Sequence, residues 1–306
     1  MDLARTLADI AEEIDANAAA IEAEADAKDA EAAPGPFGIA VALCSGEVLT
    51  AGSVDKFPIQ SIGKVFAVDL ALRAREDRVF ERVGREPSGD PFNSLVDLER
   101  THGLPRNPFI NAGALVVVDM LVEEYGEAAQ GGIVKLIEGE VDGAVTLDEA
   151  VLSEGGDLNR AMLSFMRHHE NILSADDAIM GAYARQCAIS LDVAGLARAG
   201  RFLAATRRDP DDLAGDCRAR QTRTVLALMM TCGHYDASGD FAVRVGLPAK
   251  SGVGGGILAI APQIASMAAW SPNLDQHGNS ILGVRALEML VARTGWSVFG
   301  PPLSDA

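Results

Sequence analysis

Two residues in the N-terminal quarter of the chain have the types and spacing of a serine nucleophile and its base. Ser61 and Lys64 stand three positions apart in the string Ser61-Ile-Gly-Lys64, a spacing that places both side chains on one face of a helix. A serine hydroxyl becomes reactive when a neighbour removes its proton, and a lysine amine can do so once apolar burial and a nearby helix N-terminus lower its pKa. The alternative is a helix-capping serine beside a surface lysine, because this spacing is common by chance.

A second element near the C-terminus strengthens the first. The string Lys250-Ser251-Gly252 matches the K-[S/T]-G pattern of penicillin-binding proteins and serine β-lactamases, and it comes just before a predicted strand. A glycine there lets a substrate lie along the strand edge without meeting a Cβ atom. A simple turn is the alternative for this element alone. Both elements in this order, on either side of a helical middle, favour a site for acyl transfer.

Two further residues could take part in such a site. Tyr235 precedes a junction between a helix and a strand, and a phenol close to the nucleophile could pass a proton to a leaving amine. Packing at a loop is the alternative for this tyrosine. Asn111 opens an apolar helix, where its amide could cap the helix or bind substrate.

The elements that must position these residues follow from the hydrophobic pattern. Strands are predicted at residues 37–43 and 47–50, joined by a turn at 45–46, and again at 257–261. Helical patterns dominate residues 112–230, and a last amphipathic helix is expected at 283–294. Strands at both ends and helices between them predict an α/β fold, with a mainly antiparallel sheet built from both termini and an all-helical lobe beside it.

This pattern divides the chain into three parts. Residues 1–33 form an acidic helical N-terminal segment, in which residues 22–33 have no large apolar side chain and are either a solvated helix or a loose connector. Residues 34–75 and 240–306 together form the sheet lobe, and residues 76–239 form the helical lobe.

Composition excludes several classes of function. The 306 residues include 44 acidic and 26 basic side chains, for a net charge of -18, which is the wrong sign for nucleic acid or an anionic membrane. The four cysteines are scattered and indicate neither a zinc site nor a redox pair. The N-terminus lacks a secretory pattern and no apolar run is long enough to span a membrane. We therefore expect a cytoplasmic protein.

Several longer strings resemble the signature stretches of bacterial and mitochondrial glutaminases, over most of the chain from about Phe37 to Met289. They are listed here in chain order: Gln60-Ser-Ile-Gly-Lys64, Glu86-Pro-Ser-Gly-Asp-Pro-Phe-Asn93, Pro105-Arg-Asn-Pro-Phe-Ile-Asn-Ala-Gly-Ala114, Gly246-Leu-Pro-Ala-Lys-Ser-Gly-Val253 and Trp270-Ser-Pro-Asn-Leu-Asp275. The resemblance implies the serine β-lactamase and penicillin-binding-protein-like fold. It also implies hydrolysis of L-glutamine to L-glutamate and ammonia.

Carried over to this sequence, the resemblance implies a catalytic role for three residues. Ser61 would be the nucleophile, Lys64 its base and Tyr235 a second proton-transfer group. The backbone N–H groups of Ser61 and Val253 would form the oxyanion hole. The remaining residues that would bind substrate are Gln60, Asn111, Glu154, Asn159 and Tyr183. Acyl transfer by these groups needs neither a metal nor an organic cofactor.

Three positions depart from the family pattern. The stretch Ala19-Ala20-Ile21-Glu22 stands where the family has a Tyr that covers the substrate. The family's substrate-binding Glu falls at Leu152, so that Glu154 can take its place only through a two-residue deletion. Phe165 replaces a second family Tyr. These departures concern the substrate and leave Ser61, Lys64 and Tyr235 unchanged.

Two other functions stay open at this point. The first is a hydrolase of the same fold that acts on a different amide or on a β-lactam. The second is a glutaminase-like protein that binds a small molecule or partner without turnover. Apolar helix faces also lead us to expect a homodimer or homotetramer.

Overall fold

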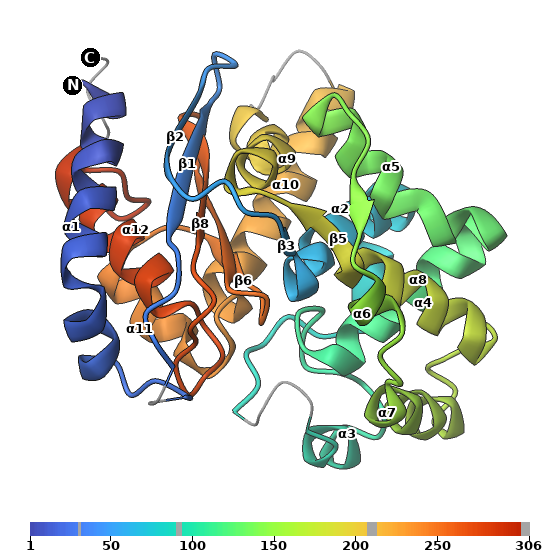
Figure 1. Cartoon of the computed structure of the whole chain (residues 1–306). Helices are drawn as coiled ribbons and strands as arrows, with labels where there is room; N and C mark the ends of the chain where they lie inside the picture. The colour runs from blue at the N-terminus through green and yellow to red at the C-terminus, as the bar shows by residue number, and fades with distance from the viewer. Residues whose placement is uncertain (30–31, 90–93, 207–212, 301–306) are drawn as a thin grey trace.

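A computed structural model describes residues 1–29, 32–89, 94–206 and 213–300, and its centre is a five-stranded sheet (Figure 1). The strand order is β2-β1-β8-β7-β6, and every neighbouring pair is antiparallel. The strands are β1 (Gly38–Leu43), β2 (Val48–Gly52), β6 (Ala249–Ser251), β7 (Gly256–Ala261) and β8 (Ala265–Trp270). Two come from the N-terminal part and three from the C-terminal part. The predicted α/β fold with a sheet built from both termini is confirmed.

Side chains that point alternately to the two sides of each strand give the sheet two buried faces. In β1, Ile39 and Val41 belong to the core shared with the terminal helices, whereas Ala40 and Ala42 belong to the core shared with the helical region. Successive side chains of a strand point to opposite faces, so this split follows from the period of two. Because both faces are covered, the strand is apolar throughout and reads as a continuous hydrophobic run.

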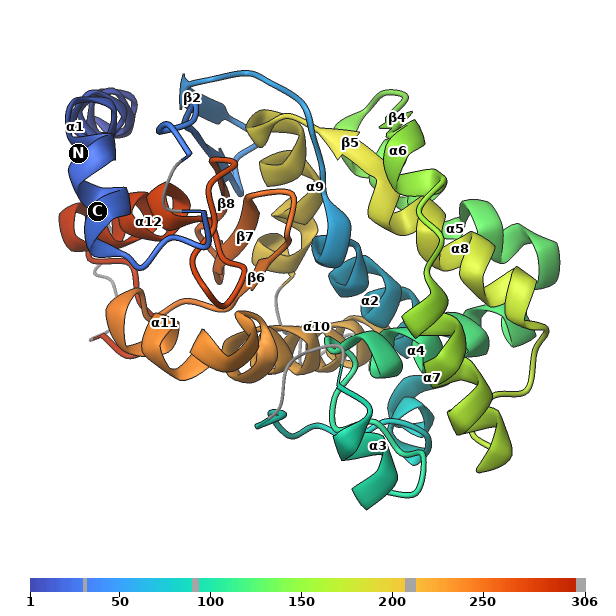
Figure 2. The same ribbon diagram turned by 60° about the horizontal axis from the view of Figure 1, so that its bottom comes forward.

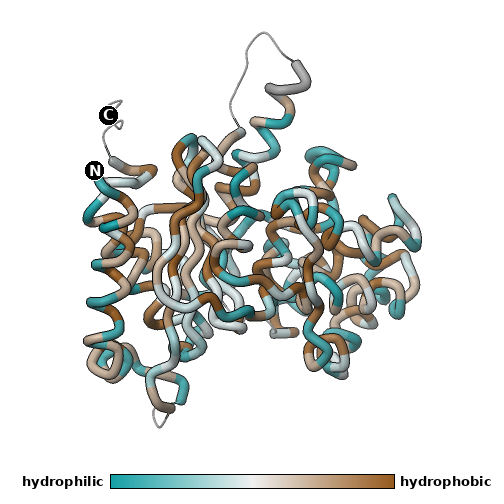
Figure 3. Tube along the Cα trace, turned by 45° about the horizontal axis from the view of Figure 1, so that its top comes forward, coloured by the Kyte–Doolittle hydropathy of each residue, from teal (hydrophilic) through white to brown (hydrophobic). Residues whose placement is uncertain are grey.

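Helices from the two ends of the chain cover one face of the sheet. They are α1 (Leu3–Glu24), α11 (Ser238–Arg244) and α12 (Ile281–Thr294). Figure 2 shows α1 beside α12 on this side. In Figure 3, α1 alternates between hydrophobic and hydrophilic residues along its length. The hydrophobic stripe includes Leu7, Ile10 and Ile14, all fully buried, as the spacing in the sequence predicts.

The end of α1 differs from the solvated segment expected there. The helix continues through Glu22 to Glu24, and Glu22 is buried. The side-chain amide of Asn273 donates a hydrogen bond of 2.8 Å to the Glu22 carboxylate. An acidic, Ala-rich sequence shows no such long-range partner, so the pattern alone could not place this contact.

The opposite face of the sheet meets the helical region. Helix α9 (Val193–Ala205) packs across β1, β7 and β8, and α10 (Leu213–Cys232) contacts β6. The other helices lie farther from the sheet (Figure 1). They are α2 (Gly63–Arg75), α3 (Val96–Arg100), α4 (Asn111–Tyr125), α5 (Ala129–Val141), α6 (Glu149–Leu152), α7 (Asp157–His168) and α8 (Asp176–Ala188). Short 3₁₀ turns occur at η1 (Gln60–Ile62), which contacts β6 and β7, and at η2 (Glu76–Glu81), η3 (Gly126–Ala128) and η4 (Tyr235–Ala237).

A small second sheet was not predicted. It has the order β3-β5-β4 and consists of β3 (Phe57–Pro58), β4 (Thr146–Leu147) and β5 (Ile189–Leu191). Strands of two or three residues are too short to show a periodic pattern. This sheet ties the segment before Ser61 to the helical region, because Phe57 pairs with Leu191.

None of the helices in the described residues combines the length and apolar composition needed to cross a bilayer. The division of the chain at residues 33, 75 and 239 stays a prediction. Helix α9, for instance, lies within 76–239 but packs on the sheet.

Candidate active site

Lys64 is a fully buried lysine next to the candidate nucleophile. Ser61 lies in η1, which runs directly into α2, and Lys64 occupies the first turn of that helix. The Lys64 ammonium nitrogen donates to the carbonyl of Phe109 at 3.1 Å and to the side-chain oxygen of Asn111 at 2.7 Å. Burial lowers the pKa of Lys64 to about 8, and the nearby Cys187 thiol opposes this change. A surface lysine, the alternative considered above, is therefore wrong.

The backbone is strained at two of the predicted residues. Gln60, just before the nucleophile, has φ of 49°, and Tyr235 has φ of 53°. A side chain in this left-handed region costs about 1–3 kcal/mol and persists where the surrounding structure enforces it. Such strain concentrates at functional sites, and here it falls on two predicted site residues.

Glycines bring the end of β6 against the Ser61 turn. A Cβ atom at Gly252 would lie 2.6 Å from the Ile59 carbonyl oxygen and 3.4 Å from the Ser61 amide nitrogen. At Gly254 it would lie 2.2 Å from the Pro58 carbonyl oxygen. Only glycine permits these approaches. The turn alternative for Lys250-Ser251-Gly252 is wrong, since Lys250 and Ser251 belong to strand β6.

Tyr235 is partly buried and lies beside the second motif. The Lys250 ammonium nitrogen lies 4.4 Å from the centre of its ring. Burial raises the pKa of Tyr235 to about 12, while hydrogen bonds with the Ser61 and Ser251 side chains oppose that rise. The phenol is therefore protonated at neutral pH and interacts with the candidate nucleophile. The simple loop-packing alternative does not account for this arrangement.

A cavity of about 450 Å³ opens at Ser61 and gathers the predicted substrate-binding residues. The predicted residues that line it are Gln60, Ser61, Asn111, Glu154, Asn159, Tyr183 and Val253. The structure places Glu154 in this wall, whereas Leu152 is not among the lining residues. Lys64 and Tyr235 join the cluster through their contacts with Asn111 and Ser61 respectively. All of the predicted site residues therefore lie together.

The side-chain amide of Asn111 forms hydrogen bonds with three other polar side chains of this site. Its oxygen accepts from Lys64 and, at 3.3 Å, from the Tyr183 hydroxyl, and its nitrogen donates to the Asn159 oxygen at 3.3 Å. Asn111 is the first residue of α4 and its side chain caps nothing there, since the N-cap position is Ile110. The helix-capping alternative is therefore wrong, and the amide faces the cavity.

Comparison with known proteins settles the family. The glutaminase family matches residues 27–299. The chain belongs to the glutaminase family. It is 49% identical over 273 residues to a glutaminase of Rhizobium johnstonii, covering 87% of this chain and 88% of that one. It is 51% identical over 269 residues to a glutaminase of Azorhizobium caulinodans, covering 86% and 87%.

Solved glutaminase structures share the fold. A Bacillus glutaminase crystallised in 4.3 M NaCl superposes with a TM-score of 0.83 at 30% identity, over 97% of this chain and 100% of that one. Mglu in its glutamate form gives a TM-score of 0.83 at 30% identity, over 98% of this chain and 70% of that one. The resemblance to glutaminases stated from the sequence is confirmed.

Sequence reasoning missed two residues of this glutaminase-family site. Cys187 lines the cavity and interacts with Tyr183 and Lys64, and burial raises its thiol pKa to about 11. Its place four residues after Tyr183, on one face of α8, was the available signal. Asn279 is buried and accepts a hydrogen bond of 2.6 Å from the Ser251 hydroxyl. Asn279 comes 28 residues after Ser251 in the sequence, and only the folding of the loop brings the two side chains together.

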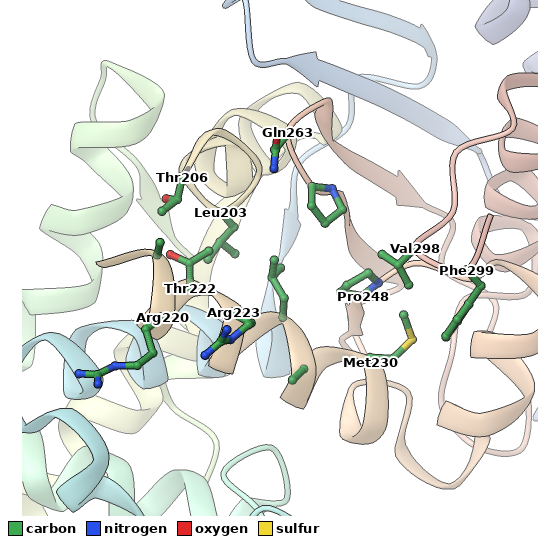
Figure 4. Close-up of a pocket in the computed structure, with 14 residues that line it drawn as sticks. Leu203, Thr206, Arg220, Thr222, Arg223, Met230, Pro248, Gln263, Val298 and Phe299 are labelled. Atoms are coloured by element: carbon green, nitrogen blue, oxygen red, sulfur yellow. The ribbon is translucent and has the colours of Figure 1, made fainter. Parts of the chain in front are cut away.

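A larger cavity of about 640 Å³ shares no lining residue with the site (Figure 4). Apolar side chains from α9, α10 and the C-terminal segment contribute to its wall, including Leu203, Met230 and Phe299. It contains none of the predicted catalytic residues. Within the described residues, no group of three or more His, Cys, Asp or Glu could hold a metal ion.

Proposed function

We propose that this protein hydrolyses L-glutamine to L-glutamate and ammonia through an acyl-enzyme on Ser61. The observation that carries the proposal is the environment of Ser61. Ser61 lines the cavity, interacts with the phenol of Tyr235, and belongs to the turn that begins the helix of Lys64. This arrangement supports the assignment of Ser61 as nucleophile, Lys64 as base and Tyr235 as acid.

In the first half-reaction, Lys64 in its neutral form accepts the Ser61 proton. The Ser61 oxygen attacks the side-chain amide carbon of glutamine and forms a tetrahedral intermediate. The amide N–H groups of Ser61 and Val253 stabilise the negative charge that develops on the substrate oxygen. The C–N bond then breaks, and ammonia leaves with a proton from Tyr235 or Lys64.

In the second half-reaction, water replaces ammonia. Lys64 accepts a proton from the water, whose oxygen attacks the γ-glutamyl ester carbon. The ester C–O bond breaks, L-glutamate leaves, and the proton returns to Ser61. A lysine with a pKa of about 8 suits both steps, because a base works best when its pKa lies near the working pH.

The cavity also suits the two charged ends of an amino acid. The Glu154 carboxylate can pair with the α-ammonium group of the substrate. Asn111, Asn159, Tyr183 and Gln60 supply amide and hydroxyl groups for the α-carboxylate and the side-chain amide.

The test is ammonia release from L-glutamine by the wild type and by Ser61→Ala. We expect release by the wild type, and loss of it in the variant with the fold unchanged by circular dichroism. Ser164→Ala is the matched control, because Ser164 is exposed on α7. L-asparagine, other amides and a chromogenic β-lactam run in parallel. Faster turnover of one of these than of glutamine would contradict the proposed substrate.

A further inference from the structure

The turn between β6 and β7 carries Val253, one of the two residues whose backbone N–H groups would bind the oxyanion. The N–H of Gly255 donates to the carbonyl of Gly252 at 3.0 Å, so residues 252–255 form a four-residue turn. The N–H of Gly252 donates to the Gly256 carbonyl, also at 3.0 Å. The turn uses the carbonyl of its first residue and the N–H of its fourth, and its own hydrogen bond does not use the N–H of Val253.

Trp270 donates a hydrogen bond to this turn. Its indole N–H donates to the Gly254 carbonyl at 2.9 Å. Trp270 is the last residue of β8, is 8% exposed, and pairs with Gly256 across the sheet. Its ring stacks on Phe57 of β3, with the ring centres 5.3 Å apart and the planes 6° from parallel. The strand pairing and the stack together hold the indole with its N–H toward the turn.

Two peptide groups connect the indole to Val253. A peptide group is planar and trans, so its carbonyl and its N–H point in opposite directions. The Gly254 carbonyl accepts from Trp270, and it shares a peptide group with the Gly255 N–H. That N–H donates to the Gly252 carbonyl, which shares a second peptide group with the N–H of Val253. A continuous chain of hydrogen bonds and peptide groups therefore runs from the indole N–H to the Val253 N–H.

This chain acts on both the direction and the strength of the last donor. Each hydrogen bond fixes the tilt of one peptide plane, and the second plane sets the direction in which the Val253 N–H points. Hydrogen bonds in a chain also polarise one another, which strengthens the donor at the far end. A Cβ atom at Gly252 would lie 3.4 Å from the Ser61 amide nitrogen. The chain therefore ends close to the other N–H group of the oxyanion hole.

We propose that Trp270 is a positioning residue whose indole N–H, through the peptide groups 254–255 and 252–253, holds the Val253 N–H toward the developing oxyanion. The inference deepens the proposed function and rests on it for the role of the Val253 N–H. Full negative charge develops on the substrate oxygen only as the tetrahedral intermediate forms. The chain should therefore affect kcat more than KM.

Replacing Trp270 with benzothienylalanine, introduced by genetic code expansion, tests the chain with little change of shape. This residue has the two fused rings of tryptophan and a sulfur atom where the indole N–H stands, so the stack on Phe57 remains and the donor is lost. Removing an oxyanion-hole donor outright lowers kcat about 10²–10³-fold. A misdirected donor should cost less, and we expect kcat for glutamine to fall about tenfold, with KM unchanged within about twofold.

The same replacement at Trp296 is the matched control. The chain has two tryptophans, and Trp296 is buried to a similar extent, with 7% exposed. Its loss of an indole N–H should leave kcat within about twofold of wild type. Trp270→Phe is a second test variant, because it also removes the indole N–H and keeps an aromatic ring against Phe57.

The position of the Val253 amide is followed by nuclear magnetic resonance of the ¹⁵N-labelled protein, and it needs no substrate. Its resonance should shift when the indole donor at Trp270 is lost, whereas the amide of the exposed Ser164 should not move. An unshifted Val253 resonance, a kcat loss no larger than in the Trp296 control, or a KM that rises as much as kcat falls would overturn the inference. A wild type that releases no ammonia from glutamine would instead contradict the proposed function, while the Val253 resonance still tests the chain.

Discussion

Two buried lysines flank the same cluster, and their surroundings differ. Lys64 comes from the helical side, where it reaches one backbone carbonyl and the side-chain amide of Asn111 at the cavity wall. Lys250 comes from the strand side, where its ammonium group reaches two backbone carbonyls, those of Gly233 and Ser251, at 3.0 and 2.6 Å. One lysine has a partner in the cavity wall, and the other joins the end of α10 to β6.

These different partners support the proposal that Lys64 exchanges protons and that Lys250 has a structural role. Burial lowers the pKa of both lysines, and for Lys250 the charge of Lys64 adds to the effect. A lysine pKa of about 8 permits exchange near neutral pH. Lys250, in contrast, donates a hydrogen bond to the Ser251 carbonyl and makes a cation–π contact with the ring of Tyr235. Depressed lysine pKa values alone would not distinguish these roles, whereas the partners of each amine do.

The largest expected effect belongs to Lys64. Lys64→Ala removes the base, so kcat for ammonia release should fall about 10²–10⁴-fold, the usual contribution of a general base. Rapid-quench kinetics with L-glutamine measure the acylation step, and circular dichroism checks the fold. A folded variant that acylates at the wild-type rate would break the comparison.

Lys250→Met should affect stability as well as rate. The carbonyls of Gly233 and Ser251 lose a buried donor, which costs about 1–3 kcal/mol in the free energy of unfolding. Urea denaturation followed by circular dichroism measures this cost. A larger loss of kcat in Lys250→Met than in Lys64→Ala would show that the roles of the two lysines are reversed.

The pH dependence of acylation sharpens the assignment of the base. Lys64 must be neutral to accept a proton, and its pKa is about 8. The acylation rate should therefore fall about tenfold per pH unit below that value and level off above it. Single-turnover rates between pH 6 and 9 give the profile. A rate independent of pH through this range would exclude Lys64 as the base.

The smallest expected effect concerns substrate binding. Glu154→Gln keeps the shape of the side chain and removes the charge that would pair with the α-ammonium group. KM for L-glutamine should rise about tenfold, with kcat changed far less. Glu149→Gln, on the neighbouring helix α6 and outside the cavity lining, is the matched control. Equal KM values for the two variants would contradict the assignment of Glu154.

Much of the fold and site followed from the sequence, for reasons specific to each element. The strand before Ser45 and the strand after Gly256 are apolar runs next to turn residues, so local pattern was enough. Gln60, Ser61, Asn111 and Val253 fall within the ordered motifs that resemble glutaminases, whereas Cys187 in the cavity wall lies outside them. Contacts between distant residues did not emerge. Asn279 shows no local signal of its bond to Ser251, and the short strand β5 has no periodicity to detect.

The burial of Lys64 likewise depends on contacts between distant parts of the chain. Its spacing from Ser61 predicted a shared helix face, but burial depends on α4 and α8, whose packing no local pattern reveals. The buried end of α1 at Glu22 is a second example, since its partner Asn273 lies 251 residues away.

The central claim is that Ser61 carries the γ-glutamyl group. The most direct measurement is intact-mass spectrometry of the protein quenched during turnover of L-glutamine, followed by peptide mapping of any adduct. The account predicts a γ-glutamyl adduct on the peptide that contains Ser61, absent from Ser61→Ala. An adduct on Cys187, or glutamine turnover that persists in Ser61→Ala, would contradict it.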